Sequence, residues 1–320
     1  MRVLVTGGAG FIGSNFVRRI LSGKGLKISA LTVLDKLTYA GNMENLAEFS
    51  SDDYEFIQGD IVDSALVNKL CARVDLVVNF AAESHVDRSI AGSREFVMTN
   101  ILGVQTLLDA ARLNGSTRFI QVSTDEVYGS LDSDSWSEES PLLPNSPYSA
   151  SKASADLICR SYYVTHKFDV VVTRCSNNYG PYQFPEKLIP RFVTNLIDDL
   201  RVPIYGNGLN VRDWLHVDDH CLGIELVSEK GKAGEVYNIG GGTELSNLQL
   251  TKKILSKLGK DEGYIQYVED RLGHDFRYSV DISKIEKELG FSPRVNWETG
   301  IESTINWYLE NQSWWRKLKK

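Results

Sequence analysis

The sequence predicts an α/β fold, a Rossmann-type doubly wound parallel sheet joined to a smaller mixed α/β domain. A strand at residues 2–5 runs directly into a turn that contains four glycines within residues 7–13. Apolar strands then alternate with helix-periodic segments, which is typical of a parallel sheet covered by helices on both faces. Beyond residue 177, prolines at positions 181, 185, 190 and 203 divide the chain into short pieces. The regular repeat therefore ends there, and we expect a second structural unit.

The glycine turn lies between the first strand and a helix expected at residues 14–21. Strand, glycine turn and helix in this order are the context of a dinucleotide-binding fingerprint. Glycines permit positive φ and close backbone approach, so a pyrophosphate can lie on the helix N-terminus. Two patterns overlap, Gly8-x-Gly10-x-x-Gly13 and Gly7-x-x-Gly10-x-x-Gly13, and the sequence leaves open which glycines contact phosphate.

The second strand, at residues 30–34, ends in Asp35. An acid about 20 residues after the glycine turn is expected to accept hydrogen bonds from the adenosine ribose hydroxyls. The same carboxylate would repel a 2′-phosphate. The sequence therefore predicts NAD rather than NADP as the cofactor.

The remaining elements continue the alternation. We expect strands at 54–58, 76–80, 119–122 and 170–173, helices at 64–70, 95–113 and 148–165, and a helix at 218–228 and a strand at 235–239 that return to the main sheet. The chain from about residue 247 should form helices and short strands. This pattern predicts an NAD-binding domain at 1–176, with a return segment at about 212–241, and a second domain at 177–320.

The segment Ser123-Thr124-Asp125-Glu126-Val127-Tyr128-Gly129 follows the fifth strand and contains two adjacent carboxylates. In an open α/β sheet, ligands bind beyond the carboxyl ends of the strands. An acid and a base side by side there indicate removal of a proton from one carbon and protonation of a neighbouring leaving group. The alternative is an ordinary helix start, with both carboxylates exposed to water at the positive end of the helix dipole.

A second candidate is Tyr148-Ser149-Ala150-Ser151-Lys152, in which the tyrosine and the lysine share one face of a helix. An ammonium near a phenol should lower the pKa of the phenol and make it a base for a hydroxyl proton. Tyr163-x-x-x-Lys167 has the same spacing. That pair lies near the end of the helix, where a lysine is expected for dipole reasons, so we interpret it as structural.

Composition and charge exclude several function classes. The 320 residues carry a net charge of −7 with a pI near 5.4, which argues against a nucleic-acid or anionic-membrane surface. The four cysteines have no paired spacing, which indicates reduced thiols in the cytoplasm. No signal peptide or membrane-spanning stretch is expected.

Two other patterns invite a functional interpretation. His216 and His220 have a spacing that could hold zinc on a helix. We expect instead that Asp218 caps a helix there, so that the histidines need not share a face, and no metal site is predicted. The pair Trp314-Trp315 is interpreted as a helix end that covers the core rather than as a nucleobase platform.

The chain resembles the extended short-chain dehydrogenase/reductase family. This resemblance rests on TGGAGFIG at 6–13, the acid at 35, Gly59-Asp60-Ile61, Asn79-Phe80-Ala81-Ala82 and YSASK at 148–152. Within the family, STDEVYG at 123–129 is similar to the dTDP-glucose 4,6-dehydratases, whereas the 4-epimerases carry small or hydroxyl residues at the two acidic positions. The runs AAESHVDRS at 81–89, RCSNNYGPYQ at 174–183 and PEKLIP at 185–190 extend the similarity over essentially the whole chain.

The resemblance implies site residues of three kinds. The catalytic residues would be Thr124, Asp125, Glu126, Tyr148 and Lys152. NAD would contact Gly7, Gly10, Phe11, Ile12, Gly13, Asp35, Lys36, Thr38, Asp60, Ile61, Ala81, Ala82, Tyr148, Lys152 and Asn178. The sugar nucleotide would contact Ser84, His85, Thr124, Asn177, Glu186, Lys187, Leu188, Pro203, Tyr205, Asn207, Arg212, Asn247, Arg271, His274 and Tyr278. Among these, Arg212 and Arg271 suit the pyrophosphate, because guanidinium groups bind phosphate oxygens bidentately.

The implied reaction is a water loss that regenerates its NAD in every turnover. Tyr148 takes the proton of the sugar 4-hydroxyl while hydride leaves carbon 4, with Lys152 and Thr124 in support. Glu126 removes the proton of carbon 5, Asp125 protonates the departing 6-hydroxyl, and hydride returns to carbon 6. This order of the two carboxylates comes from the resemblance, since charge alone allows the reverse. Asp125 must then hold its proton near neutral pH, which requires a raised pKa.

Three alternatives remain open from the sequence. An NAD-dependent 4-epimerase is disfavoured by the two carboxylates, and a noncatalytic NAD-binding regulator by Thr124, Tyr148 and Lys152. A 4,6-dehydratase for a UDP-, GDP- or N-acetylated sugar is harder to separate, because base selection depends on few contacts. The resemblance also implies a homodimer, formed by pairing the helices at 95–113 and 148–165 into a four-helix interface.

Overall fold

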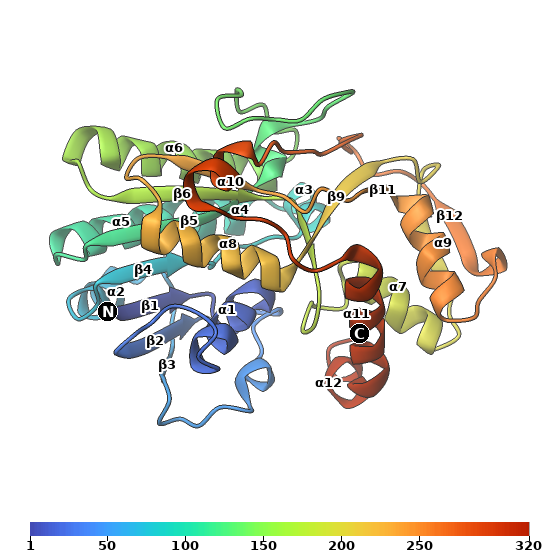
Figure 1. Cartoon of the computed structure of the whole chain (residues 1–320), viewed down its shortest axis with the longest axis horizontal. Coiled ribbons are helices and arrows are strands. Elements are labelled where there is room, and N and C mark those ends of the chain that lie inside the picture. The colour runs from blue at the N-terminus through green and yellow to red at the C-terminus, as the bar shows by residue number, and fades with distance from the viewer. Residues whose placement is uncertain (320) are drawn as a thin grey trace.

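The computed structural model, which describes residues 1–319, contains a seven-stranded parallel sheet of order β10-β6-β5-β4-β1-β2-β3 (Figure 1). The strands are β1 (Arg2–Thr6), β2 (Ala30–Asp35), β3 (Glu55–Gln58), β4 (Leu76–Asn79), β5 (Arg118–Thr124), β6 (Val170–Cys175) and β10 (Val236–Ile239). Every neighbouring pair is parallel. The predicted doubly wound Rossmann-type sheet is confirmed.

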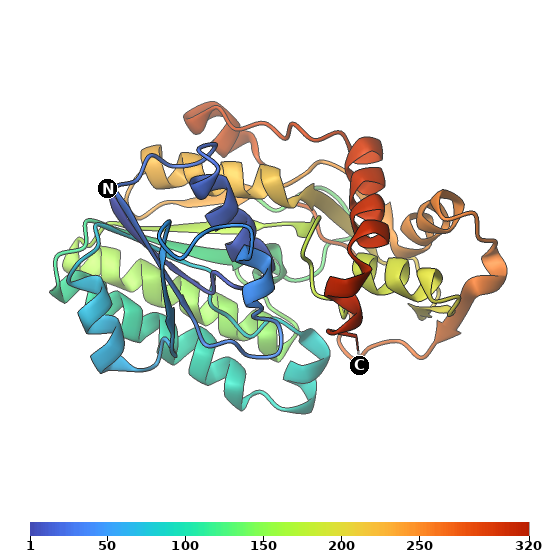
Figure 2. The same ribbon diagram turned by 90° about the horizontal axis from the view of Figure 1, so that it is seen from below.

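Helices cover both faces of this sheet (Figure 2). One layer contains α1 (Phe11–Leu21), α8 (Val217–Lys230) and α10 (Ser283–Leu289), and the other contains α2 (Ser64–Cys71), α5 (Val104–Leu113) and α6 (Pro147–His166). Side chains of a strand alternate between the two layers. In β1, Val3 and Val5 join the core beneath α1 and α8, whereas Leu4 joins the core beneath α2 and α5. Burial on both faces explains why the central strand β1 is apolar without interruption from Val3 to Val5.

The helix expected at 95–113 is interrupted by a wider turn. Its parts are α4 (Arg94–Phe96), the π-helical η2 (Val97–Gly103) and α5. Within η2, the buried Asn100 accepts from the Glu83 backbone N–H at 2.9 Å and donates to the Glu83 carbonyl at 3.0 Å. The π turn therefore ties this helix to the loop after β4. A search for the ordinary helical period cannot show such a turn.

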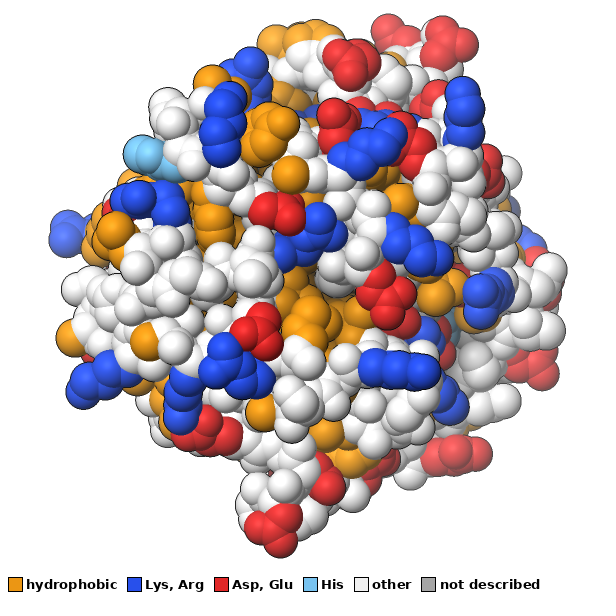
Figure 3. Space-filling model, turned by 60° about the vertical axis from the view of Figure 1, so that its left-hand side comes forward, with side chains coloured by type: hydrophobic (Ala, Val, Ile, Leu, Met, Phe, Trp, Pro, Cys, Tyr) orange, Lys and Arg blue, Asp and Glu red, His pale blue; other side chains and the backbone are white. Residues whose placement is uncertain are grey.

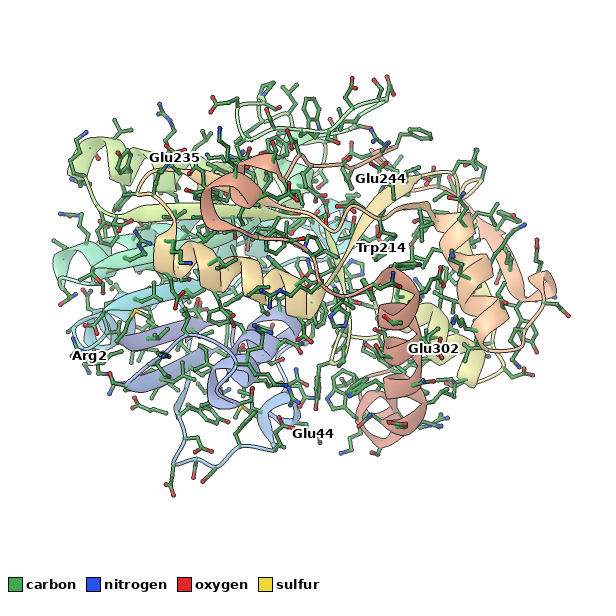
Figure 4. All side chains as sticks on the ribbon, viewed as in Figure 1. Arg2, Glu44, Trp214, Glu235, Glu244 and Glu302 are labelled. Carbon is green, nitrogen blue, oxygen red and sulfur yellow. The ribbon has the colours of Figure 1, made fainter. Side chains whose placement is uncertain are left out.

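The smaller lobe has its own sheets and its own aromatic core. A three-stranded sheet has the order β11-β9-β7, and β8 pairs with β12. The elements of this lobe are β7 (Asn177–Tyr179), α7 (Leu188–Ile197), β8 (Val202–Tyr205), β9 (Val211–His216), β11 (Glu244–Ser246), α9 (Asn247–Lys257), η4 (Glu262–Tyr264), β12 (Ile265–Val268), α11 (Trp297–Glu310) and α12 (Gln312–Arg316). Trp214 of β9, which lies between the two lobes in Figure 4, belongs to this core together with Trp314 and Trp315. The tryptophan pair is buried, so its interpretation as core-covering is confirmed.

The chain returns to the large lobe twice. The helix α8 and the strand β10 pack on the main sheet, as predicted. Later, Ile285 and Leu289 of α10 join the same core, although the sequence pattern placed this segment in the second domain. Within the expected return segment, β9 pairs with β7 and β11 instead of the main sheet. The division into 1–176 and 177–320 stays a prediction.

The histidine motif is organised differently from the prediction. The N-cap of α8 is His216, whose ring accepts from the Asp218 backbone N–H at 3.2 Å, so the assignment of Asp218 as the cap is wrong. The imidazole has an acceptor nitrogen and takes the place of a carboxylate oxygen. His220 instead contacts Asn178 at 2.9 Å. Within residues 1–319, no group of three or more His, Cys, Asp or Glu could hold a metal ion.

Surface and composition add two observations. No helix among residues 1–319 has the length and apolar character needed to cross a membrane. Lysine, arginine and acidic side chains are intermixed on the face drawn in Figure 3, with hydrophobic side chains exposed between them. The four cysteines are buried as free thiols.

Candidate active site

Two adjoining cavities lie beyond the carboxyl ends of the strands of the main sheet, where the smaller lobe meets them. They share a wall formed by Ser84, Glu126, Asn177, Glu186 and Lys187. The first cavity is lined by every residue predicted to contact NAD and by Thr124, Asp125 and Glu126. Residues from 7 to 187 of the chain therefore meet at one place, as expected for a parallel sheet whose loops leave the same edge.

The glycine turn fits a close approach of its backbone to neighbouring groups. A Cβ on Gly7, whose φ is +68°, would lie 2.6 Å from the Ala81 nitrogen, and one on Gly13 would lie 2.3 Å from the Gly7 oxygen. Gly7, Gly10 and Gly13 line the cavity. A Cβ on Gly8 would instead meet the side chain of Val33 at 2.6 Å. Gly8 therefore packs against the sheet, and the other three glycines line the cavity, which favours the pattern Gly7-x-x-Gly10-x-x-Gly13 for contact with phosphate.

Asp35 is held at the end of β2 by two backbone donors. Its carboxylate oxygens accept from the Ala9 N–H at 2.9 Å and from the Leu37 N–H at 2.8 Å. Burial raises the pKa of Asp35, while these two hydrogen bonds oppose the rise. The carboxylate is thus oriented toward the cavity that the glycine turn borders, which suits an acceptor for ribose hydroxyls.

The two carboxylates occupy the first turn of η3 (Asp125–Tyr128), a 3-10 helix capped by Thr124. The alternative of a helix start is therefore correct in secondary structure, but neither side chain is exposed: Asp125 is buried and Glu126 is partly buried. Both line the cavity. The carboxyl of Asp125 accepts from the Thr124 hydroxyl at 3.2 Å, and that of Glu126 accepts from Ser149 at 3.2 Å.

The environments of the two carboxylates differ. Burial raises the pKa of Asp125 well above its ordinary value, and the nearby charges of Glu126 and Asp213 raise it further. Burial also raises the pKa of Glu126, but Arg212, Lys187 and the Ser149 hydrogen bond act against this rise. Asp125 is therefore suited to hold a proton, and Glu126 to accept one. The raised pKa that an acid at position 125 requires is confirmed.

Tyr148 and Lys152 lie one turn apart on α6 and both face the cavity. The Lys152 ammonium donates to the Val122 carbonyl at 2.7 Å. Burial raises the pKa of Tyr148 well above its ordinary value, and the charge of Glu126 adds to this, while a hydrogen bond with Thr124 opposes it. The expectation that Lys152 lowers this pKa is wrong for the chain by itself, because burial of the phenol and the nearby carboxylates have the larger effect.

The second cavity gathers thirteen of the fifteen residues predicted to contact a sugar nucleotide, and Thr124 lies in the first cavity. Arg212 and Arg271 both line it. The Arg212 guanidinium lies 4.2 Å from the ring centroid of Tyr278 and donates to the Asp275 carbonyl at 3.0 Å, so its position is fixed before any ligand arrives.

One predicted contact is not brought to the site. Asn207 is exposed, lies outside both cavity linings, and accepts from the Leu209 N–H at 3.0 Å within its own turn. An asparagine that closes a tight turn has its side-chain oxygen already engaged. The neighbouring Tyr205 does line the second cavity.

Sequence reasoning also missed residues that line the cavities. Asp87 forms an ion pair with Arg271 at 2.7 Å, and Arg191 lines the same cavity from α7. Asp87 lies inside the run AAESHVDRS, and Arg191 directly follows PEKLIP. Their position next to recognised motifs was the available signal. No spacing rule connects Asp87 with Arg271, which is far away in the sequence.

Comparison with known proteins agrees with this geometry. The family model described as GDP-mannose 4,6 dehydratase matches residues 4–304. A dTDP-glucose 4,6-dehydratase of Actinoplanes sp. is 57% identical over 319 residues, which cover 98% of this chain and 100% of the relative. The chain belongs to the GDP-mannose 4,6 dehydratase family.

Solved structures of family members are similar throughout. The dTDP-glucose 4,6-dehydratase DesIV of Streptomyces venezuelae, solved with NAD bound, is 56% identical with a TM-score of 0.99, and all of both chains is covered. The corresponding enzyme of Bacillus anthracis, in complex with NAD, is 47% identical with a TM-score of 0.92, again over both whole chains. The resemblance predicted from the sequence is confirmed.

Proposed function

We propose that this chain is an NAD-dependent dTDP-glucose 4,6-dehydratase, a hydro-lyase that forms dTDP-4-keto-6-deoxyglucose for deoxysugar biosynthesis. The observation that carries the proposal is the pair Asp125 and Glu126 in the same cavity as Tyr148 and Lys152. A redox pair alone would suit an epimerase. An additional acid with a raised pKa and an adjacent base suit the loss of water.

The first cavity fits NAD. The glycine turn has no room for side chains at Gly7 and Gly13, and Asp35 is oriented by two backbone N–H groups. Lys36 forms an ion pair with Asp60 at 2.7 Å at the rim of the cavity. When bound there, NAD supplies the acceptor and later the donor of hydride.

Tyr148 acts as the base for the sugar 4-hydroxyl in this proposal. Thr124 is the last residue of β5, and its hydroxyl donates a hydrogen bond to Asp125. In this proposal Thr124 also orients the 4-hydroxyl of the sugar. The chain's own groups raise the pKa of Tyr148, and the positive charge that oxidised NAD would bring to this cavity would favour the phenolate. Lys152 supplies the second positive charge on the same helix face.

Glu126 then removes the proton of carbon 5, and Asp125 protonates the departing 6-hydroxyl. The order is the one that the family resemblance implies, and the surrounding charges support it: Arg212 and Lys187 favour the charged form of Glu126, whereas Glu126 and Asp213 disfavour the charged form of Asp125. A proton therefore remains on Asp125 while its neighbour is charged. Arg212 and Arg271 would hold the pyrophosphate in the second cavity.

Direct assay tests this function. Purified protein is incubated with dTDP-glucose, UDP-glucose or no sugar nucleotide, and the 4-keto product and bound dinucleotide are measured. We expect retained NAD and a 4-keto product from dTDP-glucose. Preferential turnover of UDP-glucose would show that the substrate is a UDP-sugar. Interconversion at carbon 4 without water loss would indicate an epimerase, and NADP in the denatured protein would contradict the role of Asp35.

We also propose a homodimer in the cytoplasm. Apolar side chains are exposed on two adjacent helical stretches, Val97 and Leu102 in η2 and Leu157 and Val164 in α6. These stretches contact each other on one side of the sheet. Two helices from each of two copies would cover them in a four-helix interface. The buried free thiols of the four cysteines suit a reducing compartment.

A further inference from the structure

One buried side chain behind the cofactor cavity has no role in the chemistry described above. His220 lies in the first turns of α8 and is fully buried. It does not line either cavity. Its Nδ1 atom lies 2.9 Å from Oδ1 of Asn178, a residue of β7 that does line the first cavity. A buried imidazole directed at a cavity residue is placed to act through that residue.

The amide of Asn178 has a defined orientation. Its Nδ2 donates to the Ser176 carbonyl at 2.9 Å. If the amide were turned over, its oxygen would lie at this distance from another carbonyl oxygen, and the two would repel each other. The oxygen of the amide therefore points at His220, and it needs a donor there.

The tautomer of His220 follows from this orientation. Because Asn178 Oδ1 only accepts, Nδ1 of His220 must carry the proton. Burial lowers the pKa of His220 to about 3, so the ring is neutral and has a single N–H to give. That N–H donates to Asn178, and the orientation does not depend on the pH near neutrality.

This orientation leaves one hydrogen of the Asn178 amide free for a ligand. The NH2 group has two hydrogens, and the Ser176 carbonyl takes one of them. The backbone carbonyl of Asn178 is also engaged, because it accepts from the Gln183 side chain at 2.9 Å. The second N–H is the group that Asn178 can offer to a ligand in the cavity.

We propose that His220 is a positioning residue that fixes the Asn178 amide so that its second N–H is available as a donor in the cavity where the cofactor would bind. This inference rests on the proposed function, which places NAD in the first cavity. Loss of the His220 donor would let the amide rotate, and a rotated amide would face the ligand with the wrong group. The effect should therefore appear in cofactor binding before it appears in chemistry.

The test compares His220→Phe and His220→Leu, which remove the donor, with His220→Asn, whose amide can donate from a similar position. Ser228→Ala is the matched control, because Ser228 lies on the same helix, is buried and donates only to the Ile224 carbonyl at 2.7 Å. NAD retained by the purified full-length proteins, the Kd for NAD after its removal, turnover of dTDP-glucose and thermal midpoints are measured. The two donor-free variants should bind NAD about tenfold more weakly, the order of one hydrogen bond, and His220→Asn should bind it nearly as the parent does.

A double variant decides whether His220 acts through Asn178. His220→Phe combined with Asn178→Ala should bind NAD no more weakly than Asn178→Ala alone, because the effects of one pathway do not add. The proposal would be overturned if the two substitutions weakened NAD binding additively, or if both donor-free variants bound NAD as the parent does. It would also be overturned if the loss of NAD affinity only followed the fall in thermal midpoint, as in Ser228→Ala. If neither donor-free variant folds, failure of His220→Asn to bind NAD would do the same. A parent protein without NAD and without turnover would instead refute the proposed function itself.

Discussion

At the scale of single residues, the proposed acid and base chemistry depends on the different surroundings of two neighbouring carboxylates. Asp125 and Glu126 are adjacent in the chain and Arg212 acts on both, yet their other charged neighbours differ: Asp213 raises the pKa of Asp125, while Lys187 opposes the rise at Glu126. The surrounding charges thus favour the protonated form more strongly at Asp125 than at Glu126. Each assignment has a measurable consequence.

The acid is tested by Asp125→Asn. We expect overall turnover to fall by about a hundredfold to ten-thousandfold, the usual contribution of a general acid. Oxidation at carbon 4 should continue, because Tyr148 and Lys152 are intact, so enzyme-bound NADH should accumulate and be visible by its absorbance. The control Tyr148→Phe should show no NADH. A loss of less than about tenfold in Asp125→Asn would show that the acid is another group.

The same substitution should stabilise the protein. The folded pKa of Asp125 is raised, so its contribution to stability is present below the unfolded pKa of about 4 and is lost as the pH rises toward the folded value. Asp125→Asn removes the ionisable group, so the variant does not lose this stability as the pH rises. Its free energy of unfolding, measured by denaturant unfolding, should exceed that of the parent near neutrality, with a difference that shrinks toward about pH 4. A difference that is constant with pH would contradict the buried, protonated acid.

At the scale of elements, a buried ion pair joins α6 to β6 beside the catalytic turn. Arg174 and Asp156 lie 2.9 Å apart with both side chains almost completely buried. Arg174 also donates to the Tyr128 hydroxyl at 2.8 Å, and Tyr128 donates to Asn238 at 2.8 Å. Tyr128 ends η3, so the helix, the sheet and the catalytic turn are connected through one network.

Asp156→Ala should destabilise the fold by about 3–5 kcal/mol, because it leaves the Arg174 charge buried without a partner. Denaturant unfolding measures this. The matched control is Asp75→Ala, which breaks the solvent-screened pair with Arg2 at 2.6 Å and one hydrogen bond from the Arg2 backbone N–H, and which should cost much less. Equal effects of the two substitutions would show that the buried network does not hold α6 and β6 together.

At the scale of the whole molecule, the exposed apolar residues on η2 and α6 predict an interface. Leu157→Arg should convert a dimer into a monomer at micromolar concentration, because a charge would then be buried among apolar side chains. Sedimentation equilibrium gives the mass. The control is Leu272→Arg in the loop before His274, where the side chain is 79% exposed and belongs to neither η2 nor α6; it should remain dimeric. A parent protein that is monomeric at this concentration would contradict the proposed four-helix interface.

The sequence by itself determined the order of strands and helices, the glycine turn and the acid at the end of the second strand, and it predicted candidate catalytic residues, four of which the structure places in one cavity with Thr124. Each of these depends on local patterns, since apolar period, turn residues and the placement of an acid after a strand act within about 30 residues. The fold class and the kinship with 4,6-dehydratases could be predicted for the same reason, and the structure and the comparisons confirm both.

Only the tertiary structure decided what depends on distant contacts. Gly8 packs against Val33, which lies on another strand, and Asn100 in the π turn binds the backbone of Glu83. The pKa of Tyr148 is raised because the folded chain buries its phenol. The pairing of Asp87 with Arg271 likewise joins segments with no common pattern. Desolvation and the charges across a cavity are set by which chain segments meet, and no local period of the sequence records that meeting.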